Sequence, residues 1–547
     1  RRECELLGYS RSFTIYESDD SLNVVKKCMA DLNISTQQFA PQLIRSRVSG
    51  AKNQLISPKQ YGDLARDPVD EKVAKVYAAY QRSLQQSNAM DFDDLLVKPF
   101  ELFERHSSVL EKYQHRFKFI LVDEFQDTNR AQYEVTKLLS QKYRNICVVG
   151  DDAQSIYSFR GADIRNILDF TKDYPDCKTF RLEQNYRSTK TILAAADQLI
   201  KNNLNQLEKD LWTQNPNGEK ITLLTCADDK DEGYHIAQLI QEESRRKKLD
   251  LKDFAVLYRT NAQSRSIEDA LRRSGVPYVI VGGIRFYERK EIKDVLAYLR
   301  LLANQNDEES LLRVINYPTR GIGGTTLDRL RQFAKKQSIP LFHTLARVEQ
   351  IGDLSDRIKK SLGEFRHFLL KYASLRSQMS LSELARSLVD ELGILRMFKE
   401  EGTAESLARW ENVHELLSAI SEFSQEREDA TLESFLEEVA LVSDLDEWEG
   451  TRNAATLMTL HSSKGLEFPV VFIAGLEEGL LPFYSMETSG ADLEEERRLF
   501  YVGMTRAKTK LYLTSANMRF RYGEPGFPVK SRFVTELGTE GLKVVES

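Results

Sequence analysis

The sequence FILVDEFQDTN at residues 119–129 contains the first of three short apolar runs, each of which stops at a polar cluster. The second run is ICVV at 146–149, before GDDAQSIYSFRGAD, and the third is TFRL at 179–182, before EQNYRST. Helical patterns separate the runs, so residues 117–189 predict strand, helix, strand, helix, strand. Continuous apolar strands in this order are typical of a parallel sheet that is covered on both faces.

Strands of the same kind return downstream. The predicted strands lie at 221–224, 254–258, 278–281, 456–460, 470–473 and 511–513. Residues 290–448 between them show only helical patterns, and residues 13–90 are also largely helical, with Val73, Val76, Tyr77 and Tyr80 on one helix face. We therefore predict an α/β fold with two parallel-sheet lobes, the first incomplete, and a helical insertion in each.

This interpretation divides the chain into six segments. Residues 1–12 and 91–189 form the first lobe, 13–90 a helical accessory domain, 190–289 and 449–547 the second lobe, and 290–448 an all-helical insertion. A chain of 547 residues is long enough for several domains, since single cores usually stop growing near ~250–300 residues.

The composition excludes several classes of protein. No apolar run reaches the ~18 residues that would span a bilayer, and no leader pattern opens the chain, so we expect no membrane partner and a cytoplasmic location. The five cysteines include no C-x-x-C pair and suggest neither a disulfide framework nor a zinc site. The net charge of -6 argues weakly against a nonspecific coating of nucleic acid, although a local basic groove can coexist with it.

Asp123 and Glu124 follow the first predicted strand, at the end where parallel sheets bind ligands. One carboxylate there can hold Mg²⁺, and a second can orient and deprotonate an attacking water. An isolated Asp-Glu pair would more often be an ordinary acidic helix start. The intact VDEFQDTN context, with Gln126 and Asp127 close behind, favours the chemical role.

The cluster after the second strand combines an amide with aromatic residues. Gln154 could distinguish a triphosphate from a diphosphate, because an amide near the γ-phosphate leaves the charge balance unchanged. Tyr157 and Phe159 alternate beyond it, and exposed rings are stacking platforms for unpaired bases. Taken alone, these two rings would more often belong to a core.

Two arginines could serve a transferring phosphoryl group. Arg187 lies beside Tyr186, whose ring can stack on a nucleobase, and Arg506 lies far downstream in the other predicted lobe. If they came from opposite sides of a cleft, they would clamp the γ-phosphate only when the lobes close. The loop after the strand at 456–460 adds His461, Lys464 and Glu467, although a lone histidine is usually structural.

These motifs together closely resemble the superfamily 1A helicases of the UvrD, Rep and PcrA type, over nearly the whole chain. The resemblance implies RecA-like lobes, with ATP and Mg²⁺ as cofactors. It also implies roles for single residues: Asp123 as the Mg²⁺ ligand, Glu124 as general base, Gln154 as γ-phosphate sensor, Tyr186 as adenine stacker, Glu467 as ribose contact, and Arg187 and Arg506 as arginine fingers.

The same resemblance implies a surface for single-stranded DNA and for junctions of single- and double-stranded DNA. The matching positions are Tyr157, Phe159, Arg259, Asn261, His461 and Tyr522, with Phe159 where the family often has tryptophan. RVINYPTRGIGGTTLDRL resembles a segment that contacts the duplex, where Gly321, Gly323 and Thr325 could approach a phosphate. A plain glycine-rich connector between helices is the alternative.

No G-x-x-x-x-G-K-[ST] loop occurs in this sequence, and the first residue is Arg1, in what reads as the middle of a helix. We therefore expect a start truncated relative to the family, and little or no ATPase activity from the 547-residue chain alone.

The function implied by the resemblance is an ATP-dependent 3′ to 5′ DNA translocase and helicase of DNA repair or replication restart. Repair proteins would be its partners, and it would be associated with a bacterial nucleoid. Two alternatives stay open: a noncatalytic DNA-binding or assembly module, and the helicase subunit of a recombination nuclease complex.

Overall fold

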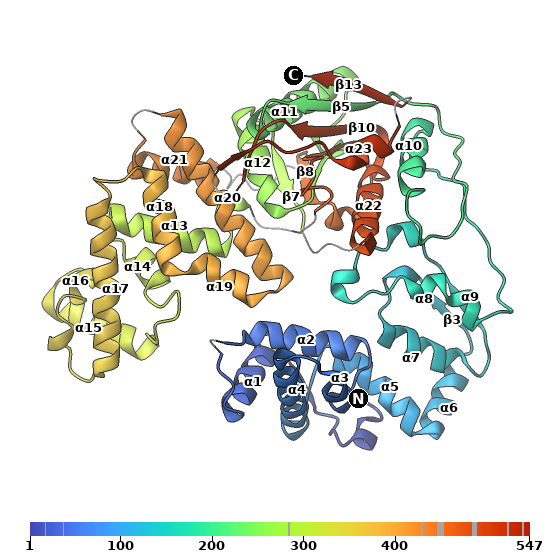
Figure 1. Ribbon diagram of the computed structural model, residues 1–547, viewed down its shortest axis with the longest axis horizontal. Coiled ribbons are helices and arrows are strands. Elements are labelled where there is room, and N and C mark those ends of the chain that lie inside the picture. The colour runs from blue at the N-terminus through green and yellow to red at the C-terminus, as the bar shows by residue number, and fades with distance from the viewer. Residues whose placement is uncertain are drawn as a thin grey trace.

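The computed structural model describes the whole chain except residues 17, 37, 283–284, 428–429, 446–452, 484–489, 522–523, 539–540 and 547. A large sheet lies at the top of the view in Figure 1, with a helical unit to its left, a second helical unit below and a small sheet at the right. None of the described helices is long and apolar enough to cross a membrane.

The large sheet has seven parallel strands in the described part of the chain, in the order β13-β5-β10-β9-β6-β8-β7. They are β5 (Ile221–Cys226), β6 (Phe254–Tyr258), β7 (Tyr278–Ile280), β8 (Ala455–Thr459), β9 (Phe468–Ile473), β10 (Ala507–Ala516) and β13 (Leu542–Glu546). The six predicted strands are confirmed. The edge strand β13 was not predicted, because its LKVVE pattern is half exposed and lacks a continuous apolar run.

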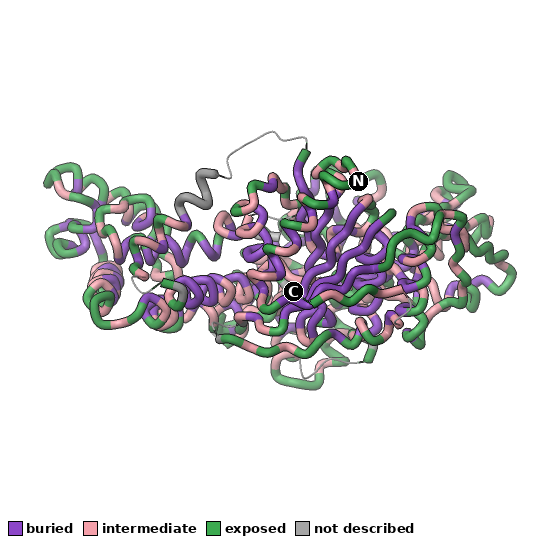
Figure 2. The backbone as a smooth tube through the Cα atoms, turned by 90° about the horizontal axis from the view of Figure 1, so that it is seen from above, coloured by how far each residue is buried: buried purple, intermediate pink, exposed green. Residues whose placement is uncertain are grey.

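Helices cover both faces of this sheet, which explains its fully buried strands, drawn in purple in Figure 2. Phe254, Val256 and Tyr258 of β6 pack with α11 (Asp229–Lys247) and α12 (Ser264–Arg273). Ala255 and Leu257, which alternate with them, pack with α10 (Lys190–Ile200) and α22 (Gly490–Met504) on the other face. The short α23 (Arg532–Glu536) joins that second layer, and β11 (Arg519–Arg521) and β12 (Glu524–Gly526) form a separate antiparallel hairpin.

In the described part of the chain the small sheet contains only β3 (Ile120–Val122) and β4 (Ile146–Val148), paired in parallel as predicted. Its helices are α5 (Asp94–Arg105), α6 (Ser107–Arg116), α7 (Arg130–Ser140), α8 (Arg165–Leu168) and α9 (Phe170–Asp173).

The prediction of a third strand at 179–182 in this lobe is wrong. Phe180 and Leu182 are 82% and 85% exposed, and the segment joins no ladder among the described residues. The residues that follow it instead bond to residue 212 and to residues 505–508. The expected cover on both faces is also absent, because Leu121 of β3 is 79% exposed.

The lower helical unit begins with β1 (Thr14–Tyr16), which pairs in parallel with β2 (Ala89–Asp91). Between them lie α1 (Ser18–Asp31), α2 (Pro41–Asn53), α3 (Pro58–Leu64) and α4 (Pro68–Gln86). As predicted, Val73, Val76, Tyr77 and Tyr80 of α4 are buried on one face.

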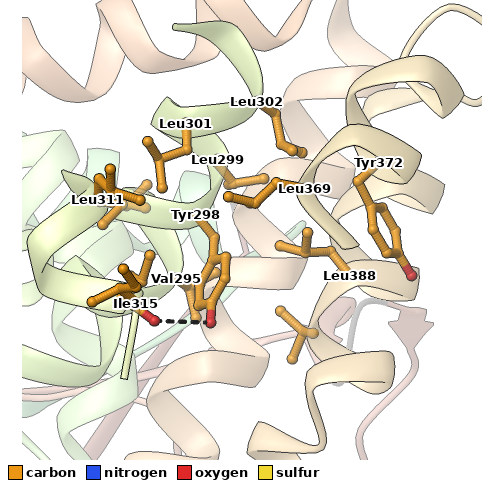
Figure 3. Close-up of a cluster of buried hydrophobic side chains, with 14 of the residues drawn as sticks. Val295, Tyr298, Leu299, Leu301, Leu302, Leu311, Ile315, Leu369, Tyr372 and Leu388 are labelled. Atoms are coloured by element: carbon orange, nitrogen blue, oxygen red, sulfur yellow. Dashed lines mark hydrogen bonds between the residues drawn. The ribbon is translucent and has the colours of Figure 1, made fainter. Parts of the chain in front are cut away.

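The left-hand unit is helical throughout its described residues, as predicted for 290–448, of which 428–429 and 446–448 lie outside the description. It contains α13 (Lys290–Ala303), α14 (Glu308–Val314), α15 (Gly324–Gln337), α16 (Leu341–Thr344), α17 (Asp356–Leu375), α18 (Leu381–Leu392), α19 (Ile394–Glu401), α20 (Ala404–Glu426) and α21 (Leu432–Leu445). Figure 3 shows Leu299, Leu369 and Leu388 meeting in its core, where the Tyr298 hydroxyl donates to the Val314 carbonyl at 3.3 Å. The six-segment division of the chain stays a prediction.

Candidate nucleotide and nucleic-acid site

Asp123 and Glu124 stand at the carboxyl end of β3 with exposed side chains. The Glu124 N–H donates to Asp123 Oδ1 at 2.9 Å, and Glu124 adopts the left-handed conformation, with φ of 49°. A residue other than glycine rarely takes this conformation, and such strain concentrates at functional loops. The turn therefore presents both carboxylates to solvent at the edge where β3 and β4 end.

Gln126 joins the two strand ends. It is fully buried, its Nε2 donates to Glu124 Oε2 at 2.7 Å, and its Oε1 accepts the Asp151 N–H at 2.9 Å. Gly150 leaves room for this side chain, because a Cβ there would lie 2.5 Å from Gln126 Oε1. Gly150 is thus needed so that the Gln126 side chain can pack where it bonds to Glu124.

Gln154 lies in the 3-10 turn Asp152–Gln154 after β4, and its Nε2 donates to Asp151 Oδ2 at 2.7 Å. Lys209 binds the other oxygen of the same carboxylate and lies 3.2 Å from Asp152 Oδ1. Lys209 was not predicted as a site residue, because it belongs to no recognisable sequence motif.

Lys464 reaches these residues from the loop after β8. Its Nζ lies 3.3 Å from Glu124 Oε2, donates to the Gln154 carbonyl at 2.8 Å and bonds to Asp127 Oδ2. Burial raises the pKa of Asp127 even though the Lys464 ammonium acts to lower it. The sequence pointed to Lys464 as part of a ligand-facing loop, but its contact with the Glu124 and Asp127 carboxylates was not foreseen.

Arg187 is held by the large-sheet lobe. Its Nε donates to Glu467 Oε2 at 2.6 Å and its Nη1 to the Thr505 carbonyl at 3.3 Å. Lys508 lies 2.7 Å from Glu467 Oε1, and hydrogen bonds from Lys508 and Arg187 lower the pKa of Glu467 to about 2. Glu467 is therefore a fixed anion between two cations.

Arg506 is a buried cation with only neutral partners in the described residues. It is 2% exposed and donates to the Val502 and Leu466 carbonyls and to Thr505 Oγ1. Burial, followed by the nearby charge of Arg187, lowers the pKa of Arg506 to about 10. A buried arginine without a carboxylate has unmet electrostatic demand that an anionic ligand can satisfy.

The expectation that Arg187 and Arg506 come from opposite sides of a cleft is wrong in this structure. The segment carrying Arg187 lies on the large sheet, where Ser188 Oγ donates to the Ala507 carbonyl at 2.7 Å and the Thr189 N–H to that of Lys508 at 3.1 Å. The segment is not a strand of the small sheet, so its polar backbone finds partners on β10 instead. Tyr186 beside it is 78% exposed, so its ring is open to a stacking partner.

Three rings gather between the lobes. The Tyr157 and Phe159 centroids are 6.0 Å apart, and the Phe159 and His461 centroids 5.4 Å, both edge to face. Burial, with the charges of Arg259 and Arg160, lowers the pKa of His461 to about 3, so the imidazole is neutral at physiological pH. Phe159 is 54% exposed, and these residues can therefore offer an aromatic surface to a base.

The other predicted DNA contacts are more scattered. Arg259 donates through Nε and Nη2 to the Glu496 carboxylate at 2.7–3.0 Å, a bidentate ion pair, so its charge is already paired. The Asn261 carbonyl accepts a hydrogen bond from Arg289 Nη1 at 2.9 Å. Tyr522 lies outside the described residues.

The glycine-rich segment stands apart, at the start of α15. Gly321 and Gly323 are exposed with open space around both, and Thr325 is exposed on the first turn of the helix. The φ of 75° at Gly321 favours glycine, which the connector alternative also explains.

The fold and these contacts define a protein of the RecA-like class, with a nucleotide-type site where two parallel-sheet lobes meet. Residues 1–175 match the UvrD/REP helicase N-terminal domain, and residues 180–518 match the UvrD-like helicase C-terminal domain. The chain belongs to the UvrD-like helicase family, whose members are ATP-hydrolysing DNA helicases.

Three relatives are proteins named ATP-dependent DNA helicase PcrA. The chain is 44% identical to the one from Bacillus subtilis (strain 168), over 99% of this chain and 74% of that protein. It is 43% identical to those from Staphylococcus aureus (strain MRSA252) and Staphylococcus epidermidis (strain ATCC 35984), over 98% of this chain and 74% of each relative. The family resemblance seen in the sequence is thus confirmed, and with it the assignment to the ATP-hydrolysing DNA helicases.

The residues present fit the Mg²⁺ that this family implies. Asp123 is exposed, and its Oδ1 accepts the Glu124 N–H. Its carboxylate still offers oxygen acceptors of the kind that Mg²⁺ prefers. No group of three or more metal-binding side chains exists among the described residues.

Proposed function

We propose that this helicase is a 3′ to 5′ translocase on single-stranded DNA that unwinds junctions with duplex DNA in repair or replication restart, on a bacterial nucleoid. The observation that carries the catalytic part is Arg506, a buried guanidinium without a carboxylate partner among the described residues, close to Arg187 and Glu467. The direction of movement and the pathway are supported by the family resemblance alone.

In this proposal the two arginines stabilise the charge that develops on the γ-phosphoryl group. Donors that are already oriented act without reorganisation, and an arginine supplied to a transferring phosphoryl group is worth ~10³–10⁵ in kcat. Arg506 is fixed by backbone carbonyls, and Arg187 is fixed by Glu467.

The two carboxylates Glu124 and Asp123 have different roles in this proposal. Glu124, steered by Gln126 and Lys464, accepts the proton of the attacking water. Asp123 would hold Mg²⁺, which when bound neutralises charge on the substrate phosphates. Gln154 Nε2, which donates to Asp151 Oδ2 here, would donate instead to the γ-phosphate when nucleotide binds.

The contacts to the nucleoside and to DNA complete the proposal. Tyr186 would stack on adenine, and Glu467 would accept a ribose hydroxyl. Single-stranded DNA would cross Tyr157, Phe159 and His461, where each stacked base is worth ~1–3 kcal/mol. Arg259, Asn261 and Tyr522 would border that path, and Gly321, Gly323 and Thr325 would meet duplex phosphates.

The test replaces Arg187 or Arg506 by alanine in the full-length gene product. Unwinding of a duplex with a 3′ single-stranded tail should be lost while binding of single-stranded DNA stays within about threefold of the wild type, because both arginines face the nucleotide. Arg396→Ala removes an 82% exposed arginine from the helical insertion and serves as the control. Normal unwinding by either active-site variant would refute the assignment.

Direction needs a separate measurement. A helicase that moves 3′ to 5′ reaches the 5′ end of a single strand, so a dye there should respond during ATP hydrolysis and a dye at the 3′ end should not. The reverse pattern would overturn the proposed direction.

A further inference from the structure

Residues 203–212 follow α10 (Lys190–Ile200) in the chain, and we call this segment the strap. Helix α22 holds its first part. The Leu204 N–H donates to Glu494 Oε1 at 2.8 Å, Asn205 Nδ2 to Glu494 Oε2 at 3.3 Å, and Arg497 Nη1 to Asn203 Oδ1 at 2.7 Å. This end of the strap therefore follows the position of the large-sheet lobe.

The middle of the strap binds the end of β4 in the other lobe. The Leu207 N–H donates to Asp152 Oδ2 at 3.2 Å, and Lys209 Nζ bonds to Asp151 and lies 3.2 Å from Asp152 Oδ1. Burial opposes the ammonium charge, yet the charges of Asp151 and Asp152 raise the pKa of Lys209. Lys209 is thus a largely buried, charged anchor, with its side chain 18% exposed.

Asp151, which Lys209 holds, makes two further hydrogen bonds within the site. Its carboxylate accepts Gln154 Nε2 at 2.7 Å, and its backbone N–H donates to Gln126 Oε1 at 2.9 Å. Gln126 in turn donates to Glu124 Oε2 at 2.7 Å. Lys209 is therefore linked to Gln154 through the Asp151 carboxylate, and to Glu124 through the backbone of Asp151 and the side chain of Gln126.

The far end of the strap reaches the Arg187 segment. The Trp212 N–H donates to the Glu183 carbonyl at 3.0 Å, and the Asn185 N–H to the Trp212 carbonyl at 2.7 Å. One short segment thus touches α22, the end of β4 and the residues next to Tyr186 and Arg187.

We propose that Lys209 is a positioning residue for ATP hydrolysis, and that the strap transmits the position of α22 to the Asp151 carboxylate and thereby to Gln154 and Glu124. The inference rests on the proposed roles of Gln154 and Glu124. Without the Lys209 ammonium, the partly buried Asp151 carboxylate loses its ion pair and moves toward solvent, and Gln154 loses its fixed acceptor.

The experiment compares Lys209→Met with the wild-type full-length gene product in DNA-stimulated ATP hydrolysis. We expect kcat to fall by about 10- to 100-fold, as for a small misplacement of catalytic groups, with a much smaller change in KM for ATP. The Kd for single-stranded DNA should stay close to wild type, and the midpoint of thermal unfolding should fall by only a few degrees, because Lys209→Met leaves two carboxylates of one lobe without their cation. Lys209→Arg, which keeps the charge, should hold kcat within about threefold of wild type.

Lys201→Met is the matched control, since Lys201 lies at the start of the same connection and its 56% exposed side chain pairs with Asp197 alone among the described residues, at 2.6 Å. Its kcat should match the wild type. An unchanged kcat in Lys209→Met, or a loss that parallels equal losses in stability and DNA binding, overturns the proposal. Absence of DNA-stimulated hydrolysis in the wild type would instead contradict the proposed function itself.

A second variant tests the link to α22. Asn205→Asp places a carboxylate beside Glu494 and should loosen the strap by repulsion between like charges. We expect kcat to fall several-fold, in the same direction as for Lys209→Met. Unchanged kcat in Asn205→Asp would remove α22 from the proposed path.

Discussion

Removal of the Lys464 ammonium should loosen the contact between the two lobes. Lys464 is 9% exposed, and its Nζ contacts Glu124, Asp127 and the Gln154 carbonyl. Removing one partner of a buried ion pair costs ~3–5 kcal/mol. Because Asp127 keeps some access to solvent, we expect about 2 kcal/mol for Lys464→Met.

Hydrogen exchange can measure this cost locally, which matters because a chain of several domains does not unfold in two states. The Asp127 and Thr128 N–H groups donate to the Glu124 and Phe125 carbonyls at 2.9 and 3.2 Å, so their exchange reports opening of this loop. A loss of about 2 kcal/mol corresponds to exchange roughly 30-fold faster.

The effect should also depend on pH. Burial already raises the pKa of Asp127, and loss of Lys464 raises it further. A carboxyl group whose pKa is higher in the folded than in the unfolded state destabilises the fold above that pKa and ceases to do so once protonated. The difference between variant and wild type should therefore be present at neutral pH and shrink as the pH falls through the pKa of Asp127.

A double-mutant cycle decides whether the ion pair is the cause. Asp127→Asn in the Lys464→Met background should restore most of the lost protection, because no buried charge is left unpaired. If the two substitutions were additive to within about 0.5 kcal/mol, the ion-pair argument would be refuted.

Three other variants test the site. As the pH falls from 6.5 to about 3, the wild type should lose more stability than His461→Phe, because burial lowers the pKa of the folded imidazole to about 3 while the unfolded chain takes up the proton at higher pH. Thermal denaturation at several pH values measures this, and equal slopes of stability against pH for the two proteins would contradict it. Arg259→Met should destabilise the fold by about 2–3 kcal/mol, because it strands Glu496, and Glu496→Gln in the same chain should recover part of the loss, as calorimetry would show. Gly150→Ala should lower stability by about 1–3 kcal/mol, because its Cβ would lie 2.5 Å from Gln126 Oε1; a normal unfolding temperature would show that Gln126 has room to move.

The sequence by itself determined the large sheet and the helical insertion. Six of its seven strands were predicted, because strands covered on both faces need continuous apolar runs, such as FAVLY of β6. It also determined the family, since motifs as long as VDEFQDTN and GDDAQSIYSFRGAD, in this order, seldom occur by chance.

Only the tertiary structure decided which charges meet. The TFRL run has the pattern of a strand but joins no ladder among the described residues, and its continuation lies on β10, where Arg187 comes near Arg506. Nothing in the sequence pairs Lys209 with Asp152 or Lys464 with Asp127, because these partners lie 57 and 337 residues away along the chain. Pairing of distant charges depends on how the two lobes dock, and local periodicity carries no information about that docking.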